Sequence, residues 1–383
     1  MKRITLVCLA LIGVALLGGC ASTKNENLKT FDTNLANKYP PLAVFWGRPS
    51  ASLQQECQAF AASSVMKMCN ENLVDVNLFY RSFMASQVFE KVTLGDETSD
   101  YNLAISTVHF SDEDAGDIAK GALAGATLLL VPVDMKQHTK AEVTVYWRDW
   151  PLKVYHYELP FVHTMQLFTD PMQGQKDYAE ALVSHVIADM QQDDIFSHRF
   201  MVDNFHTSDY EKELVYPEQL AGFEYAEHMI YNDPFLGAAV RYVEPELRNE
   251  VLDVFVYPAR FVDLVDVPEV LAKEARNVQR EIEYVAKQNK WQALELEEIV
   301  PINAGGLAGV YFDGSYTVDL DLPEYTSTFL FLKEDKFIKI RANFPGKHVK
   351  EQVLASLAQF TAPKESDFMK EVRLKSSQRG MQE

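Results

Sequence analysis

Apolar and polar residues alternate along the first half of the chain, a pattern typical of strands with one buried face. Every second residue from Ala141 to Trp147 is apolar, so these side chains would share one face of a strand over residues 139–147. Other strands are predicted at residues 42–46, 89–92, 101–110, 127–135 and 152–168. Apolar side chains spaced at helical intervals predict an amphipathic helix over residues 178–190, and a second helix is predicted over residues 71–86.

In the second half, a helical apolar stripe is followed by several strands. The stripe lies in a predicted helix that Asp266 and Pro268 open and that ends near Trp291. Its members are Leu271, Ala275, Val278, Ile282 and Val285. Strands are predicted at residues 237–242, 251–257, 294–302, 308–318, 326–333 and 336–343, and a closing helix at residues 349–360.

These elements predict an α+β fold with two domains, each an antiparallel sheet packed with helices. The N-terminal domain is expected over residues 39–197 and the C-terminal domain over residues 217–363, joined by a polar junction at residues 198–216. Residues 364–383 are expected to form a charged, frayed tail. Residues 21–38 are polar and lack periodicity, so residues 20–38 are expected to form a flexible tether.

The N-terminus carries the features of a secretory signal. Lys2 and Arg3 precede an apolar run from Ile4 to Leu17, and small residues follow it before Cys20. An ordinary cleaved signal and a transmembrane helix are the alternatives, but the apolar run is shorter than the roughly 20 residues needed to span a bilayer. Residues 1–19 are therefore predicted to be a signal peptide that is removed.

The run Leu17-Gly18-Gly19-Cys20 resembles the lipobox of bacterial lipoproteins. The resemblance implies that the Cys20 thiol receives a diacylglyceryl group, and that the chain is then cut before Cys20 and acylated on the new amine. Ala21 after the cysteine implies the outer membrane. The expected location is thus the periplasmic face of the outer membrane, with Cys20 as the lipid anchor.

Two further resemblances concern the folded halves. Residues 40–197, through Val88–Val92 and Thr127–Pro132, loosely resemble small α+β domains of Gram-negative envelope lipoproteins. Tyr231, Gly237, Tyr242 and the run from Val254 to Pro258 faintly resemble PsbP/Mog1-like domains. These motifs are structural and imply no catalytic chemistry.

Composition agrees with a folded, acidic protein. Of 383 residues 47% are apolar, and the formal net charge is −19, which becomes −21 once Lys2 and Arg3 leave with the signal. A chain of this charge repels phosphate, so nucleic acid is not expected as a partner.

Cys57 and Cys69 are the candidates for a disulfide in an oxidising compartment. In one continuous helix the two residues would lie about 18 Å apart, too far for a bridge. Either the chain bends near residues 61–64 and a disulfide forms, which we favour, or both thiols are free.

No catalytic, cofactor or metal motif occurs in the sequence. Ser184 and His185 are neighbours on a helix and would not face each other, and His156 and His163 fall on opposite faces of a strand. His198 and His206 are interpreted as solvated histidines of the junction rather than metal ligands. Residues 112–117 fail the calcium-loop pattern, and Asp319 and Asp321 are interpreted as exposed strand residues.

The apolar run from Gly121 to Val133 is too short to span a membrane and is expected to be buried core; exposed, it would be a patch for a partner.

The leading hypothesis is a non-enzymatic binding or accessory module in envelope assembly or transport, with an envelope protein as a possible partner. The alternative is a periplasmic hydrolase with an unrecognised active site. A pocket holding a perturbed acid or histidine would favour the hydrolase, and an apolar groove would favour binding.

Overall fold

The computed structural model describes residues 27–380 apart from 97, 113–121, 123–132, 166–169, 171, 247–248, 262 and 319–321. The chain divides into two compact units, Met1–Asp193 (unit 1) and Asp194–Glu383 (unit 2). Each unit combines a sheet with helices, so the predicted α+β class is confirmed.

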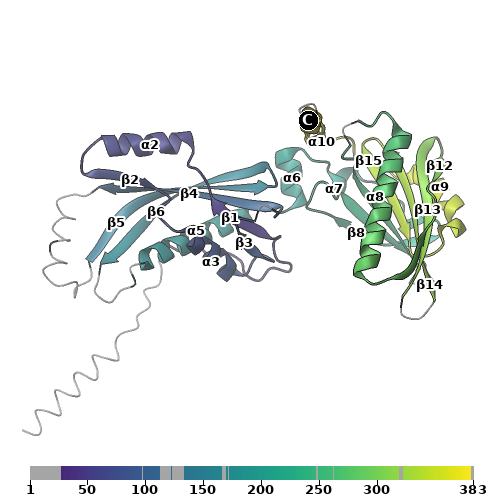
Figure 1. Cartoon of the computed structure of the whole chain (residues 1–383), viewed down its shortest axis with the longest axis horizontal. Coiled ribbons are helices and arrows are strands. Elements are labelled where there is room, and N and C mark those ends of the chain that lie inside the picture. Colours follow the sequence, from purple (N-terminus) through teal and green to yellow (C-terminus); the bar gives the residue numbers. More distant parts are fainter. Residues whose placement is uncertain are drawn as a thin grey trace, which may run out of the picture. The chain divides into compact units, whose positions relative to one another are not determined.

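Unit 1 is built on a six-stranded sheet with the order β3-β1-β4-β5-β6, in which β2 also pairs with β4 (Figure 1). Its strands are β1 (Leu42–Trp46), β2 (Lys67–Glu71), β3 (Val92–Leu94), β4 (Tyr101–Asp112), β5 (Val133–Trp147) and β6 (Trp150–Met165). Its helices are α2 (Ala51–Ala62), α3 (Val76–Ser86) and α5 (Gln173–Gln192). The pairs are antiparallel except that β1 runs parallel to β3 and β4, a detail that the sequence does not predict.

Helices cover both faces of this sheet (Figure 1). Phe60 of α2 contacts Phe110 of β4 on one face, with ring centroids 5.2 Å apart. On the other face the ring of His109 meets Phe161 of β6, which in turn meets Tyr178 of α5. Because both faces are covered, β4 is buried along most of its length.

Unit 2 is built on a nine-stranded antiparallel sheet with the order β11-β13-β14-β15-β10-β9-β8-β7, in which β12 also pairs with β13. Its strands are β7 (Gln219–Leu220), β8 (Phe223–Ile230), β9 (Ala238–Val243), β10 (Val251–Pro258), β11 (Gln292–Leu296), β12 (Val300–Ala304), β13 (Leu307–Thr317), β14 (Pro323–Lys333) and β15 (Lys336–Ala342). Its helices are α6 (His198–Phe205), α7 (Tyr210–Glu213), α8 (Val267–Gln288), α9 (Lys350–Ser356) and α10 (Asp367–Gly380), with short 3₁₀ turns η1 (Gly346–His348) and η2 (Leu357–Gln359).

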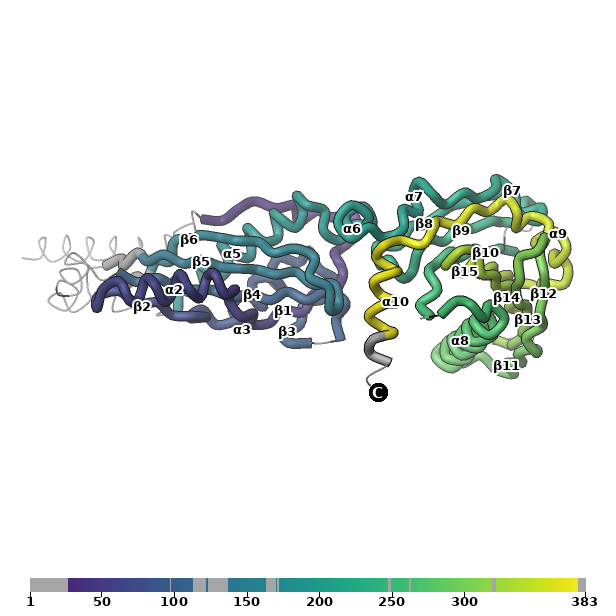
Figure 2. The backbone as a smooth tube through the Cα atoms, turned by 90° about the horizontal axis from the view of Figure 1, so that it is seen from above, coloured from purple at the N-terminus to yellow at the C-terminus, as the bar shows by residue number. Residues whose placement is uncertain are grey.

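Helices α8 and α9 lie on different sides of the unit 2 sheet (Figure 2). Each face of this sheet carries its own core, one under α8 and one under α9. The predicted stripe of α8 is buried at Leu271, Ala275, Val278 and Ile282, whereas Val285 is 41% exposed. On the opposite face Val353 of α9 packs into the core that contains Phe329 and Ile338. The side chains of β14 and β15 alternate between the two cores.

Two predicted segments differ from the structure. Residues 198–216, expected as a polar junction, contain α6 and α7 and belong to unit 2, where Phe200, Tyr210 and Leu214 are buried. Residues 364–380, expected as part of a frayed tail, form α10 after a short lead, and Phe368 and Met369 are buried. Both segments carry isolated apolar residues among many charges, so their average polarity hides the side chains that anchor them.

Candidate functional site

A groove in unit 1 has a volume of about 450 Å³ and lies between the N-terminal segment, α3 and α5. Its apolar lining comes from all three elements: Leu28, Phe31, Leu78, Ala85 and Val183. Its polar lining is Lys29, Arg81, Ser82, Ser86, Lys176, Glu180 and Ser184. The volume lies within the range of roughly 300–1,000 Å³ that is typical of small-molecule sites.

The amphipathic sequence of α3 sets its orientation in the groove. Phe79 and Phe83 are fully buried against the sheet, so Leu78, Ser82 and Ala85 are turned to another side of the helix. Asp75 caps the helix by accepting the N–H of Asn77 at 2.9 Å, and this bond is the main cause of the lowered pKa of Asp75. The groove wall therefore rests on a helix that is fixed by its core face and by its cap.

The N-terminal segment is hydrogen-bonded to α5, and Figure 2 shows this purple segment beside that helix. The Lys29 N–H donates to Ser184 Oγ at 2.9 Å, and Lys29 Nζ forms an ion pair with Asp189. Asp32 and Gln191 exchange two hydrogen bonds, of 2.8 and 2.7 Å. The expectation of a flexible tether over residues 20–38 is therefore wrong for this bonded part of the segment.

Ser184 and His185 use separate partners, as the helical spacing predicts. Ser184 Oγ accepts from Lys29 and donates to the Ala181 carbonyl at 2.7 Å, whereas the His185 ring contacts the carbonyl oxygen of Asn27 at 3.1 Å. These two side chains hold the N-terminal segment and do not form a catalytic dyad.

The charges at the groove are mostly basic. Lys176 pairs with Asp170 at 2.5 Å, and this bond contributes most to the lowered pKa of Asp170. Arg81 forms no ion pair within the described residues, and the pKa of Glu180 is raised, first by partial burial and then by Asp177. The groove thus presents, beside its apolar walls, the guanidinium of Arg81, which forms no ion pair within the described residues although its charge helps to lower the pKa of Asp75.

A second cavity, of about 380 Å³, lies beside α2, β5 and β6 and contains the arrangement closest to a catalytic cluster. Ser50 gives both its backbone N–H (2.7 Å) and its hydroxyl (2.5 Å) to the buried Glu142 carboxylate. His156 Nδ1 lies 3.8 Å from the same carboxylate. Ser50 is also the N-cap of α2, so Glu142 fixes the start of this helix on the sheet. The Ser50 hydroxyl donates to this carboxylate and not to a histidine, so the cluster lacks the serine–histidine contact of a catalytic triad.

Cys57 and Cys69 are joined by a disulfide, with Cα atoms 5.5 Å apart. Helix α2 ends at Ala62, a turn follows at Ser63, and β2 brings Cys69 back beside Cys57. The bend that the bridge requires is present at the predicted position.

Several sequence candidates fall elsewhere. Cys20 and residues 1–26 lie outside the described residues, as do 113–117 of the acidic loop, most of the apolar run 121–133, and Asp319 and Asp321; His163 is described in backbone only. His198 begins α6 with both ring nitrogens buried, so the interpretation as a solvated histidine is wrong for this residue, and His206 caps the end of the helix. In the parts of the chain that the structure covers, no three acidic, histidine or cysteine side chains gather as a metal site. None of the helices in those parts is long and apolar enough to cross a membrane.

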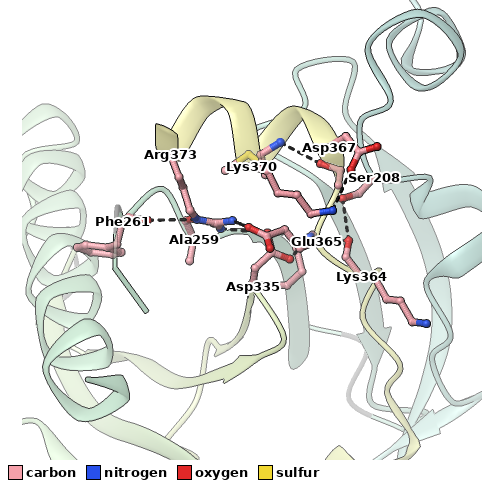
Figure 3. A network of polar contacts seen from close by, with 12 residues as sticks. Ser208, Ala259, Phe261, Asp335, Lys364, Glu365, Asp367, Lys370 and Arg373 are labelled. Carbon is pink, nitrogen blue, oxygen red and sulfur yellow. Dashed lines mark hydrogen bonds and ion pairs between the residues drawn. The ribbon is translucent and has the colours of Figure 1, made fainter. Parts of the chain in front are cut away.

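A buried charge cluster in unit 2 has no sequence signal of its own (Figure 3). Arg373 of α10 donates to Asp335 at 3.0 Å and to the carbonyl oxygens of Ala259 and Phe261 at 2.8 and 3.2 Å. The fully buried Lys336 pairs with Asp335, and burial is the main cause of its lowered pKa. Because its polar groups are bonded to one another, this cluster fastens α10 to the sheet and does not form an open site.

No protein-family model and no curated protein matches the chain. Among solved structures, the chain is similar to PsbP (CyanoP) from the cyanobacterium Synechocystis, with 14% identity and a TM-score of 0.26 over 39% of this chain and 92% of that one. A DUF330 protein from Xanthomonas campestris gives 15% identity and a TM-score of 0.23 over 41% and 89% of the two chains. PsbP-like and DUF330 folds are thus among its structural neighbours, but scores this low carry no argument about activity.

Proposed function

We propose that this protein is a lipid-anchored binding module at the periplasmic face of the outer membrane, acting as an accessory in envelope assembly or transport. The observation that carries the binding role is the groove of unit 1, with its apolar walls from three elements and its basic side chains. The anchor is the lipidated Cys20 that the lipobox implies.

The bonded N-terminal segment supports a position of the groove close to the membrane. If Cys20 is acylated, only residues 20–26 separate the anchor from the segment that forms one groove wall. These residues span at most about 25 Å when fully extended. The groove would then meet ligands at or near the bilayer surface.

The hydrolase alternative would use either Glu180 of the groove, whose pKa is raised by partial burial, or the second cavity. In the groove, the Ser184 hydroxyl donates to the Ala181 carbonyl and not to Glu180.

The second cavity offers a carboxylate and a histidine. Its carboxylate, Glu142, is occupied by the cap of α2, and among the described residues no nucleophile is bonded to the ring of His156, which lies 3.8 Å from this carboxylate. The hydrogen bonds from Ser50 explain why a glutamate can be buried here without any catalytic role. Binding is therefore the better supported of the two functions.

In-cell photo-crosslinking tests the proposal. A photoreactive phenylalanine analogue is placed at Ala85, in the groove, and at Lys38, an exposed control position in the same unit. Mass spectrometry of the purified protein should find a specific adduct from Ala85 and none from Lys38. The adduct should diminish when Cys20→Ser prevents acylation and therefore attachment through the lipid anchor.

Identical adduct patterns from the two positions would contradict a binding role of the groove. An undiminished Ala85 adduct with Cys20→Ser would contradict the dependence on the membrane anchor and leave the groove as a binding site. The two parts of the proposal are thereby tested separately.

A further inference from the structure

We infer that the groove binds a single-chain amphiphile with an anionic head group, such as a fatty acid, with the head at Arg81 and the chain along the apolar walls. This inference rests on the proposed function, because it names the ligand class of the same groove. It is carried by the shape of the groove, by its lining and by its charge.

The two helices contribute two stripes of lining residues that face each other; Leu78, Ala85 and Val183 are their apolar members, and Ser82, Lys176 and Glu180 are polar. Leu78, Ser82 and Ala85 follow one another at helical spacing along α3, and Lys176, Glu180 and Val183 do so along α5. Seven residues of helix rise about 10 Å, so the walls are long enough to line a chain of several methylene groups. A volume of about 450 Å³ is near the lower end of ligand sites and suits one acyl chain better than a two-chain lipid.

The N-terminal segment closes the third side with apolar groups. Leu28 is 45% exposed although it lines the groove, and Phe31 lies beside it. The segment is held by hydrogen bonds to α5, so this wall stays in place while its apolar side chains remain accessible. Covering this apolar surface with a chain would remove it from water, which is favourable.

The charge of the groove selects the head group. The chain carries a formal charge of −19, yet the groove lining has three basic side chains and one carboxylate. Lys29 and Lys176 are paired with Asp189 and Asp170, which leaves Arg81 as the lining cation without an ion pair within the described residues. A guanidinium can form two parallel hydrogen bonds to a carboxylate or phosphate, and a cationic head would meet repulsion at the same place.

Calorimetric titration of three amphiphiles with equal chains tests the inference. The protein begins at Ala21, so it carries no acyl group and keeps every residue that the structure describes. Dodecanoate, the net-neutral lauryldimethylamine oxide and cationic dodecyltrimethylammonium are titrated at pH 8, below their micelle concentrations. Dodecanoate should bind most tightly and the cation most weakly.

Four variants locate the interaction. Arg81→Gln should weaken dodecanoate binding about tenfold, because it removes a charged hydrogen-bond donor, while binding of the neutral amphiphile stays unchanged. Arg81→Lys should keep most of the affinity, and Lys38→Gln should match the wild type. Ala85→Trp, which fills the groove from an exposed helix position, should abolish the binding of all three.

One contrary result is that dodecanoate and the neutral amphiphile bind equally well, are insensitive to Arg81→Gln and no longer bind to Ala85→Trp. This result would overturn the inference of an anionic head group and leave the groove as a binding site. If none of the three amphiphiles binds, or if binding persists in Ala85→Trp, the inference that the groove binds an amphiphile is overturned. The crosslinking at Ala85 then decides separately whether the groove binds something else.

Discussion

Replacement of Arg373 by alanine should strongly destabilise unit 2, although the sequence places this residue in an apparent tail. Its side chain is only 10% exposed and its guanidinium bonds Asp335, Glu365 and two backbone carbonyls (Figure 3). The change removes these donors and leaves the Asp335 carboxylate, 4% exposed, with Lys336 as its remaining ion-pair partner.

The expected loss is about 3 kcal/mol, the lower end for breaking a buried ion pair, because Asp335 keeps one cation. With a urea dependence of about 1–3 kcal/mol per molar, this loss lowers the unfolding midpoint of unit 2 by about 1–3 M. Asp335→Asn combined with Arg373→Ala should cost less than the sum of the single variants, because the two residues form one network.

The assay is urea unfolding followed by pulsed hydrogen exchange and mass spectrometry. Peptides from β14 and β15 report unit 2, and peptides from β4 and β5 in the same sample serve as an internal reference. Lys370→Ala is the matched control on α10, because its ion pair with Asp367 is exposed and contributes little. A midpoint for Arg373→Ala equal to that of Lys370→Ala would refute the role of the cluster in fastening α10.

Three further predictions concern unit 1 and the anchor. Replacing Cys57 and Cys69 together by serine should lower the free energy of unfolding of unit 1 by about 3 kcal/mol, because the bridge restricts the conformations of the unfolded chain. An unchanged urea midpoint would show that the bridge contributes nothing. Burial lowers the pKa of His109 in the folded protein below its value of about 6.5 in the unfolded chain. Unit 1 should therefore have its full free energy of unfolding above pH 6.5 and lose part of it as the pH falls from 6.5 towards the pKa of His109 in the folded state. His109→Gln should remove this part of the pH dependence, and an identical slope in both proteins would contradict the linkage. Cys20→Ser should abolish acyl labelling and leave the signal uncut, whereas labelling equal to that of the wild type would end the lipoprotein interpretation.

Strong periodicity made much of the fold predictable. The stripe of α8 and the alternation of β5 place many apolar residues on one face, and burial follows from that repetition. The parallel pairing of β1 with β3 and β4 has no such signal, because pairing direction depends on how distant segments meet.

The groove and α10 were not predictable for a related reason. Phe368, Met369 and Arg373 anchor α10, and the partners of Arg373 lie far away in the sequence, so local composition describes a polar tail. The groove needs Leu28 and Ala85 to meet across the N-terminal segment and α3. The spacing of Leu78, Ser82 and Ala85 is a weak sequence sign of a helix face that is not used by the core.

The central claim, that the groove of unit 1 holds a ligand, is tested most directly by native mass spectrometry of the protein released gently from its own membrane. The wild type should carry a non-covalent adduct of small mass, and Ala85→Trp, purified in the same way and folded to the same stability, should lack it. A wild-type protein without any adduct, or an adduct of equal occupancy in Ala85→Trp, would contradict the account.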